Sequence, residues 1–148
     1  MPYLARSLAV LLALASLTAC TATGTTSASA TSSLNEPNTP DAVATAYLRA
    51  LASGDAAAVC RRLVVNNVPL VDLPSGTINA CMRQEYPKLA TALPAGLADS
   101  AGTVTVSGAT ISGTTADFTT ATFTPAAAAS LKNLKAIQVK EQWYIAVD

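Results

Sequence analysis

Residues 39–55 read TPDAVATAYLRALASGD and mark the start of the folded part of the chain. Thr39 is a candidate helix N-cap with proline at the first helical position, and Gly54 is a typical stop signal. Apolar side chains recur between them on one helical face: Val43, Tyr47, Ala50 and Leu51. We therefore expect an amphipathic helix that begins at Pro40 and ends before Gly54.

Two further helices are predicted after this one. Asp55 is a candidate N-cap for the second, whose apolar face carries Val59, Cys60, Leu63 and Val64. Residues 65–75 contain two prolines and are predicted to form a loop. A third helix opens at Ser75 or Thr77 and is kinked or ended by Pro87. One side of this helix carries Ile78, Cys81, Met82 and Glu85 or Tyr86.

The hydrophobic period then changes from about 3.6 residues to 2, which indicates strands. Valine alternates with Thr and Ser over residues 103–107, and a Thr-rich strand covers residues 114–124 after a tight turn at Ser112-Gly113. A polar turn at residues 140–142 separates the last two strands. Their alternating apolar residues are Ile137, Val139, Trp143, Ile145 and Val147.

Two positions predict irregular backbone between these strands. Phe118 and Phe123 differ in parity, so both can face the core only if their strand carries a bulge. Gly108 marks a break in the partner strand, and residues 125–133 form either one short helix or a long loop. Helices followed by strands indicate an α+β fold, in which the helices pack on one face of an antiparallel sheet.

Composition excludes several classes of function. The chain has 148 residues, with nine Lys or Arg against nine Asp or Glu and no His. Balanced charge on only 12% charged residues does not give the basic surface of a nucleic-acid-binding protein. The absence of His excludes Ser/His and Cys/His catalysis and removes the commonest metal ligand. The sequence therefore predicts no nucleic-acid partner, no metal and no cofactor.

The amino-terminal residues have the features of an export signal. Arg6 precedes an apolar run over residues 8–17, which is about half the roughly 20 residues that a membrane-spanning helix needs. The run ends in Leu17-Thr18-Ala19-Cys20, which resembles the bacterial lipobox. This resemblance implies cleavage before Cys20 and a diacylglyceryl group on its thiol. The alternative is an ordinary Cys20 beside an A-x-A-like cleavage site.

The expected organisation follows from this segment. Residues 1–19 are a predicted signal peptide, residues 20–39 a lipidated Cys and flexible tether, and residues 40–148 the folded domain. The tether is rich in Thr and Ser and has one large apolar residue, Leu34, as is typical of flexible linkers. We expect an exported protein that the lipid on Cys20 anchors to the outer face of the cytoplasmic membrane.

The folded part resembles a known family. Residues 44–55 (ATAYLRALASGD), a following helix with Cys60, a second cysteine at Cys81 and a terminal strand centred on Trp143 carry the resemblance. They are similar to the small nuclear-transport-factor-2-like domains of exported bacterial lipoproteins. The resemblance covers most of residues 40–148. It implies a cone, in which a curved antiparallel sheet wraps around helices and often leaves a pocket at the open end.

Lipidation of Cys20 leaves Cys60 and Cys81 as a pair. In an oxidising compartment, an even number of cysteines more often forms a disulfide than stays reduced. Both lie on the predicted apolar side of their helices, and closing this loop would stabilise the domain by about 3 kcal/mol. A redox-active pair is the alternative, but it lacks C-x-x-C spacing. Two cysteines without His also leave a zinc ion short of ligands.

Some proteins of this broad fold are isomerases or SnoaL-like cyclases. The resemblance to them implies an Asp base and a Tyr or acid donor inside the cone, where burial raises the pKa of the Asp. The candidate bases are Asp117, Asp72 and Asp99, and the candidate donors are Tyr47, Tyr86 and Tyr144. The predicted pocket residues are Asp117, Tyr47, Tyr86 and Trp143. In the alternative interpretation, the Asp residues lie in exposed loops or on the outer sheet face, and the tyrosines lie at the core edge.

Three functions remain open at this point. The first is a tethered, non-catalytic binding or interaction module for a small apolar ligand, a peptide or another envelope protein. The second is an acid-base isomerase or cyclase, and the third is a structural or accessory lipoprotein without a pocket. We expect the first, because the Ala, Val, Thr and aromatic content suits an apolar site and no short motif connects the candidate acids and bases.

Overall fold

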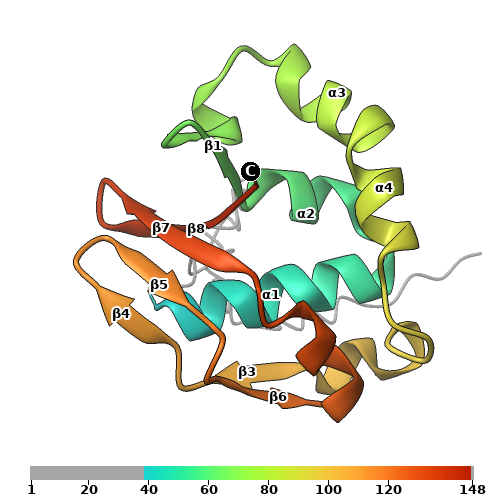
Figure 1. Cartoon of the computed structure of the whole chain (residues 1–148). Coiled ribbons are helices and arrows are strands. Elements are labelled where there is room, and N and C mark those ends of the chain that lie inside the picture. The colour runs from blue at the N-terminus through green and yellow to red at the C-terminus, as the bar shows by residue number, and fades with distance from the viewer. Residues whose placement is uncertain (1–38, 148) are drawn as a thin grey trace, which may run out of the picture. The chain divides into compact units, whose positions relative to one another are not determined.

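The computed structural model describes residues 39–147 (Figure 1). Its helices are α1 (Pro40–Ser53), α2 (Ala56–Arg61), α3 (Gly76–Gln84) and α4 (Tyr86–Thr91), with 3₁₀ helices η1 (Leu70–Asp72), η2 (Ala98–Thr103) and η3 (Ala126–Leu131). Its strands are β1 (Leu63–Val65), β2 (Val68–Pro69), β3 (Thr105–Ser107), β4 (Thr110–Ser112), β5 (Thr115–Asp117), β6 (Thr122–Thr124), β7 (Lys135–Val139) and β8 (Gln142–Ala146). The predicted signal peptide, Cys20 and the tether up to residue 38 lie outside the described residues.

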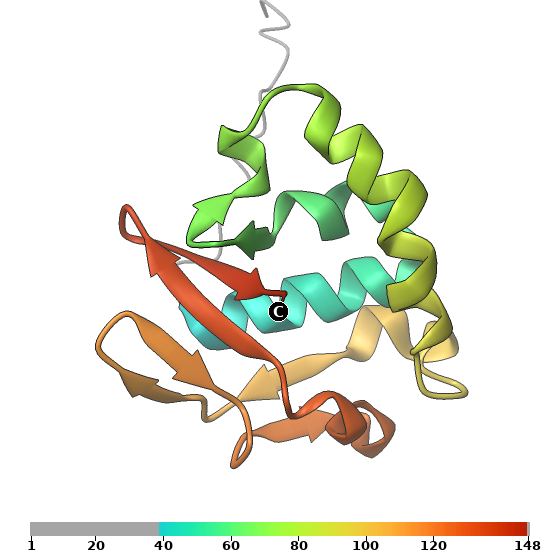
Figure 2. The ribbon, with the colours of Figure 1, turned by 45° about the horizontal axis from the view of Figure 1, so that its top comes forward.

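A curved, mostly antiparallel sheet contains six strands in the order β2-β1-β8-β7-β5-β4. Strands β1 and β8 run parallel, and the other neighbours in this sheet are antiparallel. Strands β3 and β6 form a separate antiparallel pair. Figures 1 and 2 show α1 running through the middle of the fold, with β8 on one side and β3 on the other. The predicted α+β class, with helices against a mostly antiparallel sheet, is confirmed.

Helix α1 begins and ends where its sequence predicts. The Thr39 hydroxyl caps it by accepting a hydrogen bond from the Ala42 N–H at 3.2 Å. Gly54, at φ +82°, takes the left-handed conformation that ends a helix, and its N–H bonds back to carbonyls of the last turn. The predicted apolar face is buried in the core: Val43, Tyr47, Ala50 and Leu51, together with Ala44 and Leu48.

A polar stripe on α1, formed by Asp41, Thr45 and Arg49, covers the open edge of β3. These residues follow one another at i, i+4 and i+8, so they share one face of the helix. Their hydrogen bonds are Arg49 Nε to Val104 O at 2.7 Å, Val106 N to Thr45 Oγ1 at 2.9 Å, and Gly108 N and Ala109 N to the Asp41 carboxylate at 3.0 and 2.9 Å. The α1 stripe therefore satisfies backbone groups that a neighbouring strand would otherwise pair.

The second predicted helix is shorter than expected. Helix α2 ends at Arg61, and Leu63 and Val64, which were predicted on its apolar face, belong to strand β1. The Ile145 N–H donates to the Arg62 carbonyl at 2.8 Å and ties this segment to β8. The prediction was wrong because a run rich in β-branched residues gains more from a ladder with β8 than from one more helical turn.

Residues 65–75, predicted as a loop, contain a short strand and a 3₁₀ helix. Asn66 and Asn67 have φ values of +51° and +62° and form the tight turn from β1 into β2. Pro69 lies in β2, at the edge of the sheet, where a residue without an N–H is tolerated. This segment is therefore an edge hairpin followed by η1.

The single bulged strand predicted over residues 114–124 is wrong, because the chain forms two strands, β5 and β6, that belong to different sheets and are joined by a turn. Phe118 and Phe123 are both buried, because the chain leaves the six-stranded sheet after Asp117 and joins the separate β3–β6 pair at Thr122. Gly108, on the partner strand, has φ +87° and joins β3 to β4. The chain therefore bends at Gly108 and again between β5 and β6, and each phenylalanine reaches the core.

Several boundaries differ from the prediction by a few residues. The β4–β5 turn lies at residues 113–114 rather than 112–113, and Ser112 belongs to β4. The third predicted helix is divided into α3 and α4, with Pro87 in the first turn of α4. Residues 125–133 contain η3. In the last hairpin Trp143 and Ile145 are buried, whereas Ala136 rather than Ile137 faces the core from β7.

Candidate functional site

A disulfide between Cys60 and Cys81 joins α2 to α3, as the sequence predicts. The two Cα atoms are 6.0 Å apart, and both residues are buried. Cys81 is the one buried residue of α3, and α4 has none. We name residues 76–91, which form α3 and α4, the arm. The disulfide links the arm covalently to the rest of the fold, and the partly buried Ile78, Met82, Tyr86 and Leu89 of the arm also pack against the core.

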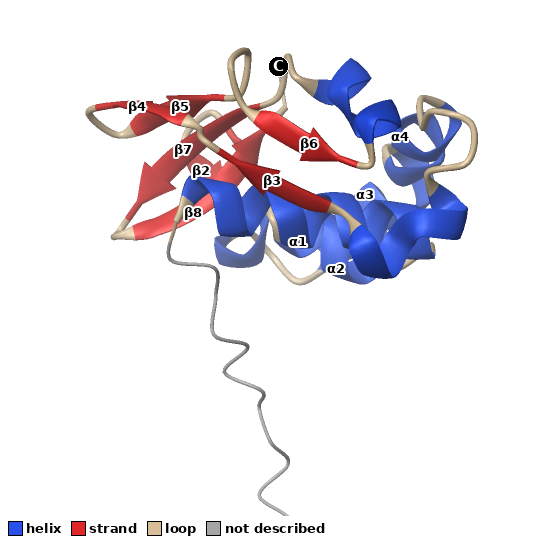
Figure 3. Ribbon diagram, turned by 90° about the horizontal axis from the view of Figure 1, so that it is seen from below, coloured by secondary structure: helices blue, strands red, loops and turns tan. Residues whose placement is uncertain are grey.

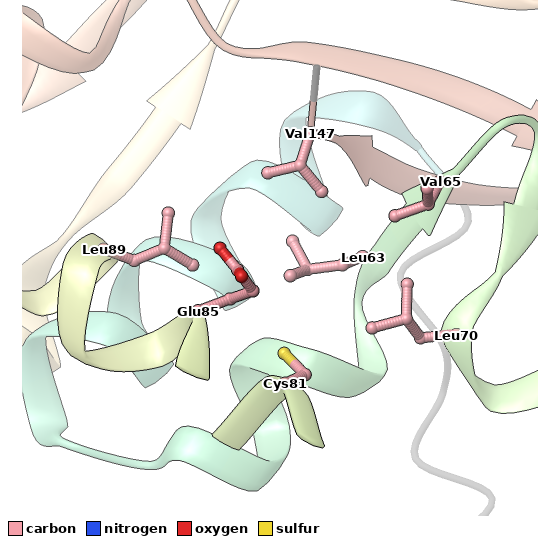
Figure 4. A pocket seen from close by; sticks show the side chains of 7 residues that line it. All are labelled: Leu63, Val65, Leu70, Cys81, Glu85, Leu89 and Val147. Atoms are coloured by element: carbon pink, nitrogen blue, oxygen red, sulfur yellow. The ribbon is translucent and has the colours of Figure 1, made fainter. Parts of the chain in front are cut away.

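An apolar groove lies between the arm and the edge of the sheet (Figure 4). Its deeper part has a volume of about 260 Å³ and is lined by Leu63, Val65, Leu70, Cys81, Glu85, Leu89 and Val147. A second part, of about 240 Å³, adds Leu73, Thr77, Ala80 and Gln84 and shares Val65, Leu70, Cys81 and Glu85 with the first. We name the two parts together the arm groove, since the shared residues make them continuous.

Each wall of the arm groove comes from a different part of the chain. Strand β1 and the end of the chain after β8 supply Leu63 and Val147, whereas α4 supplies Leu89. Val65 lies at the opening and is 39% exposed. Val68 and Val71, from the same edge hairpin and η1, are also exposed. An apolar cavity beside exposed valines is typical of a surface that binds an apolar group.

Glu85 is the charged residue in the lining of the arm groove. Figure 4 shows its carboxylate directed into the deeper part, between Leu89 and Leu63. The Lys88 Nζ lies 3.1 Å from one Glu85 oxygen, and the Glu85 side chain is 54% exposed. A hydrated, ion-paired carboxylate at this position can bind the polar end of a ligand whose apolar part fills the groove.

Asp117 lies at the end of β5, and its carboxylate is held at the surface. Thr119 donates to the same carboxylate oxygen from its hydroxyl at 2.7 Å and from its N–H at 3.2 Å. The hydrogen bonds from Thr119, first from its side chain and then from its backbone, lower the pKa of Asp117. A base inside an apolar pocket needs the opposite environment, so this carboxylate matches the interpretation that places it outside the core.

The three aromatic candidates occupy different environments. Tyr47, on α1, is buried in the core, and burial raises the pKa of its hydroxyl to about 12. Trp143 is buried in β8, and Tyr86 is half-buried at the start of α4. Within residues 39–147, no hydrogen bond links these side chains to one another or to Asp117. They do not line the arm groove.

The remaining candidates are also separated. Asp72 lies in η1, where the Lys140 Nζ reaches its carboxylate at 3.1 Å, and Asp99 lies exposed in η2. Tyr144 faces away from the core between the buried Trp143 and Ile145. In the described part of the chain, no three Cys, Asp or Glu side chains gather as a metal site would need.

Sequence reasoning did not identify the arm groove. Its lining residues Val65 and Leu70 fall in the segment predicted as a loop, and Leu63 was placed on a helix. The signal that identifies them is the asparagine pair at residues 66–67, which predicts a hairpin turn between two apolar runs.

No protein-family profile, curated protein or solved structure matches the chain. Between residues 39 and 147, none of the helices combines the length and hydrophobicity needed to cross a bilayer.

Proposed function

We propose that this protein is a membrane-tethered lipoprotein of the cell envelope whose folded domain is a non-catalytic binding module. Its ligand is an apolar molecule or apolar side-chain cluster with a polar end, held in the arm groove. The observation that supports this proposal is the groove itself, where aliphatic side chains surround a cavity and one carboxylate faces into it.

The lipid anchor is part of the same proposal. The chain has three cysteines, and the disulfide accounts for two of them. Cys20 follows an apolar run in a lipobox-like motif, so it is the cysteine that lipidation would modify. The helix-first α+β order also fits a nuclear-transport-factor-2-like domain, which we propose as the family.

The acid-base isomerase alternative has less support. It needs a base and a donor that face one substrate, but Asp117 is held at the surface by Thr119 and Tyr47 is buried away from the groove. Glu85 faces the groove without a Tyr, Asp or second Glu in the lining. The third alternative, an accessory lipoprotein without a pocket, is disfavoured by the groove volume.

A fluorescent apolar probe tests the binding function. Ala80 lines the arm groove and Asn79, its neighbour on α3, is exposed. We expect Ala80→Trp to fill the groove and weaken the binding of N-phenyl-1-naphthylamine to the full chain by about 10-fold or more, which corresponds to about 1.4 kcal/mol. Asn79→Trp adds the same side chain outside the groove and should bind the probe as the wild type does. Equal affinity in both variants would refute the assignment of the groove.

A further inference from the structure

The open edge of the β3–β4 segment is covered over only part of its length. The α1 stripe satisfies the outward backbone groups from Val104 to Ala109. Strand β4 follows directly and is the last strand of the six-stranded sheet. Figures 1 and 3 show the β4–β5 hairpin projecting past the start of α1. The cover therefore ends before Ile111.

Hydrogen-bond parity directs the backbone of Ile111 toward this open edge. The Gln138 N–H donates to the Thr114 carbonyl at 2.7 Å, so Thr114 faces β7 and, two residues on, Ala116 does too. Thr115 and Asp117 then face β4 and pair with Ser112 and Thr110. Ile111, between them, has its N–H and C=O on the outer side. Among residues 39–147, no hydrogen bond reaches these two groups.

The Ile111 side chain continues a row of core residues to the same edge. Cross-strand neighbours share a sheet face. The row runs Ile111, Ala116, Ala136, Ile145 and Leu63 across five strands. The last four are 0 to 3% exposed, whereas Ile111 is 56% exposed. Within residues 39–147, no strand lies beyond β4 to bury the Ile111 side chain at the end of this row.

Strand β4 itself lacks the features with which proteins prevent strand pairing, although the Asp41 carboxylate covers the Gly108 and Ala109 N–H groups just before it. Edge strands are usually protected by charged side chains, especially Lys, or by Pro. The other edge of the sheet has Pro69 in β2. Residues 100–116 contain no charged residue and no Pro. The edge formed by β4 is therefore uncharged, apolar at Ile111 between the polar Thr110 and Ser112, and bordered by the Asp41 carboxylate at Ala109.

We propose that β4 pairs with β4 of a second copy of this chain, antiparallel and about a two-fold axis at Ile111. The two Ile111 residues then exchange both backbone hydrogen bonds and pack their side chains together, and Thr110 lies opposite Ser112 of the other copy. A second copy fits because the edge offers one outward residue, which a two-fold axis matches to itself. Residues 110–112 carry no charge, so the two β4 strands bring no like charges together.

The contact is small, so the pairing is weak in solution and strengthened when both copies are held on one membrane. The strengthening on a membrane rests on the proposed lipid anchor, whereas the pairing itself does not depend on the anchor or on a groove ligand. A dimer of this kind joins two sheets edge to edge. The arm grooves border the opposite edge of each sheet and stay open.

Sedimentation equilibrium of the full chain in density-matched detergent tests the pairing. We expect a monomer–dimer equilibrium at protein concentrations up to about 1 mM. Ile111→Lys should weaken the dimer by about 10-fold or more, because it places a charge at the axis. Val68→Lys, at the other edge of the sheet, and Ala80→Trp, in the arm groove, should leave the dimer unchanged. A wild-type chain that stays monomeric overturns the proposal and leaves the groove function untouched.

Photo-cross-linking tests the register without relying on the Lys variant. A mixture of ¹⁴N- and ¹⁵N-labelled full chains carries p-benzoylphenylalanine in place of Ser112. The proposal predicts mixed-isotope cross-links to the residues around Thr110 of the other copy. The same photoreactive residue at Val68 should give none. Mixed-isotope cross-links that map elsewhere, or a dimer that persists in Ile111→Lys, would place the copies on another surface and overturn the proposal.

Discussion

Reducing the Cys60–Cys81 disulfide should loosen the arm before it affects the rest of the fold. The bond closes a loop with a sequence separation of 21 residues, for which the chain-entropy relation gives about 3 kcal/mol of stabilisation. A domain of this size loses roughly 5 °C of melting temperature per kcal/mol, so we expect a decrease of roughly 15 °C. Comparing oxidised and reduced wild-type protein is the cleanest assay, because almost the same side-chain atoms are present in both.

The arm should respond in a specific way. Among the residues of α3 and α4, only Cys81 is fully buried, so reduction removes the covalent attachment of one groove wall and leaves it held by partly buried side chains such as Ile78 and Leu89. We expect the reduced protein to lose probe binding at temperatures where it is still folded by circular dichroism. Cys60→Ala/Cys81→Ala should reproduce the loss, and Cys20→Ala serves as the matched control with an intact disulfide. Unfolding free energies that agree within about 0.5 kcal/mol for oxidised and reduced protein would refute this reasoning.

Three further predictions concern single side chains. Burial raises the pKa of Tyr47 to about 12, above its unfolded value, so its contribution to stability is complete below pH 10 and lost as pH rises toward 12. Between pH 9 and 11 the wild type should lose about 1 kcal/mol more of its free energy of unfolding than Tyr47→Phe in urea titrations; equal losses in the two proteins would contradict this prediction. Gly54→Ala should lower the free energy of unfolding by about 1 kcal/mol, because φ is +82° at this position. Gly76 lies in the first turn of α3 with open space around it, so Gly76→Ala should leave the melting temperature unchanged or raise it. Asp41→Ala should lower the free energy of unfolding by about 1 to 2 kcal/mol and increase amide exchange at residues 108–109. Unchanged exchange would contradict the role of the α1 stripe in covering these N–H groups.

The sequence predicted those elements whose local signals agree with their packing. In α1 the cap at Thr39, the glycine at Gly54 and the apolar face all indicate the same helix, and no tertiary contact competes with it. The burial of both Phe118 and Phe123 agrees with the sequence, but it is achieved by two strands of different sheets and not by one bulged strand. The disulfide followed from the expected compartment and the number of cysteines.

The rest depended on contacts between distant segments. Leu63 and Val64 continue a helical pattern, but a parallel ladder with β8, far along the chain, makes them a strand. The arm groove requires this strand, the edge hairpin and the arm together, so no single stretch encodes it. The open edge at Ile111 depends on the bend at Gly108, which reverses the side to which the following residues point.

Native mass spectrometry of the protein extracted from the membranes of lipoprotein-processing cells tests the central claim most directly. The proposal predicts a chain that begins at an acylated Cys20, contains the Cys60–Cys81 disulfide and carries a bound apolar molecule. That molecule should be lost in Ala80→Trp and retained in Asn79→Trp. A chain without an acyl adduct, or one with the same ligand content in both variants, would contradict the claim.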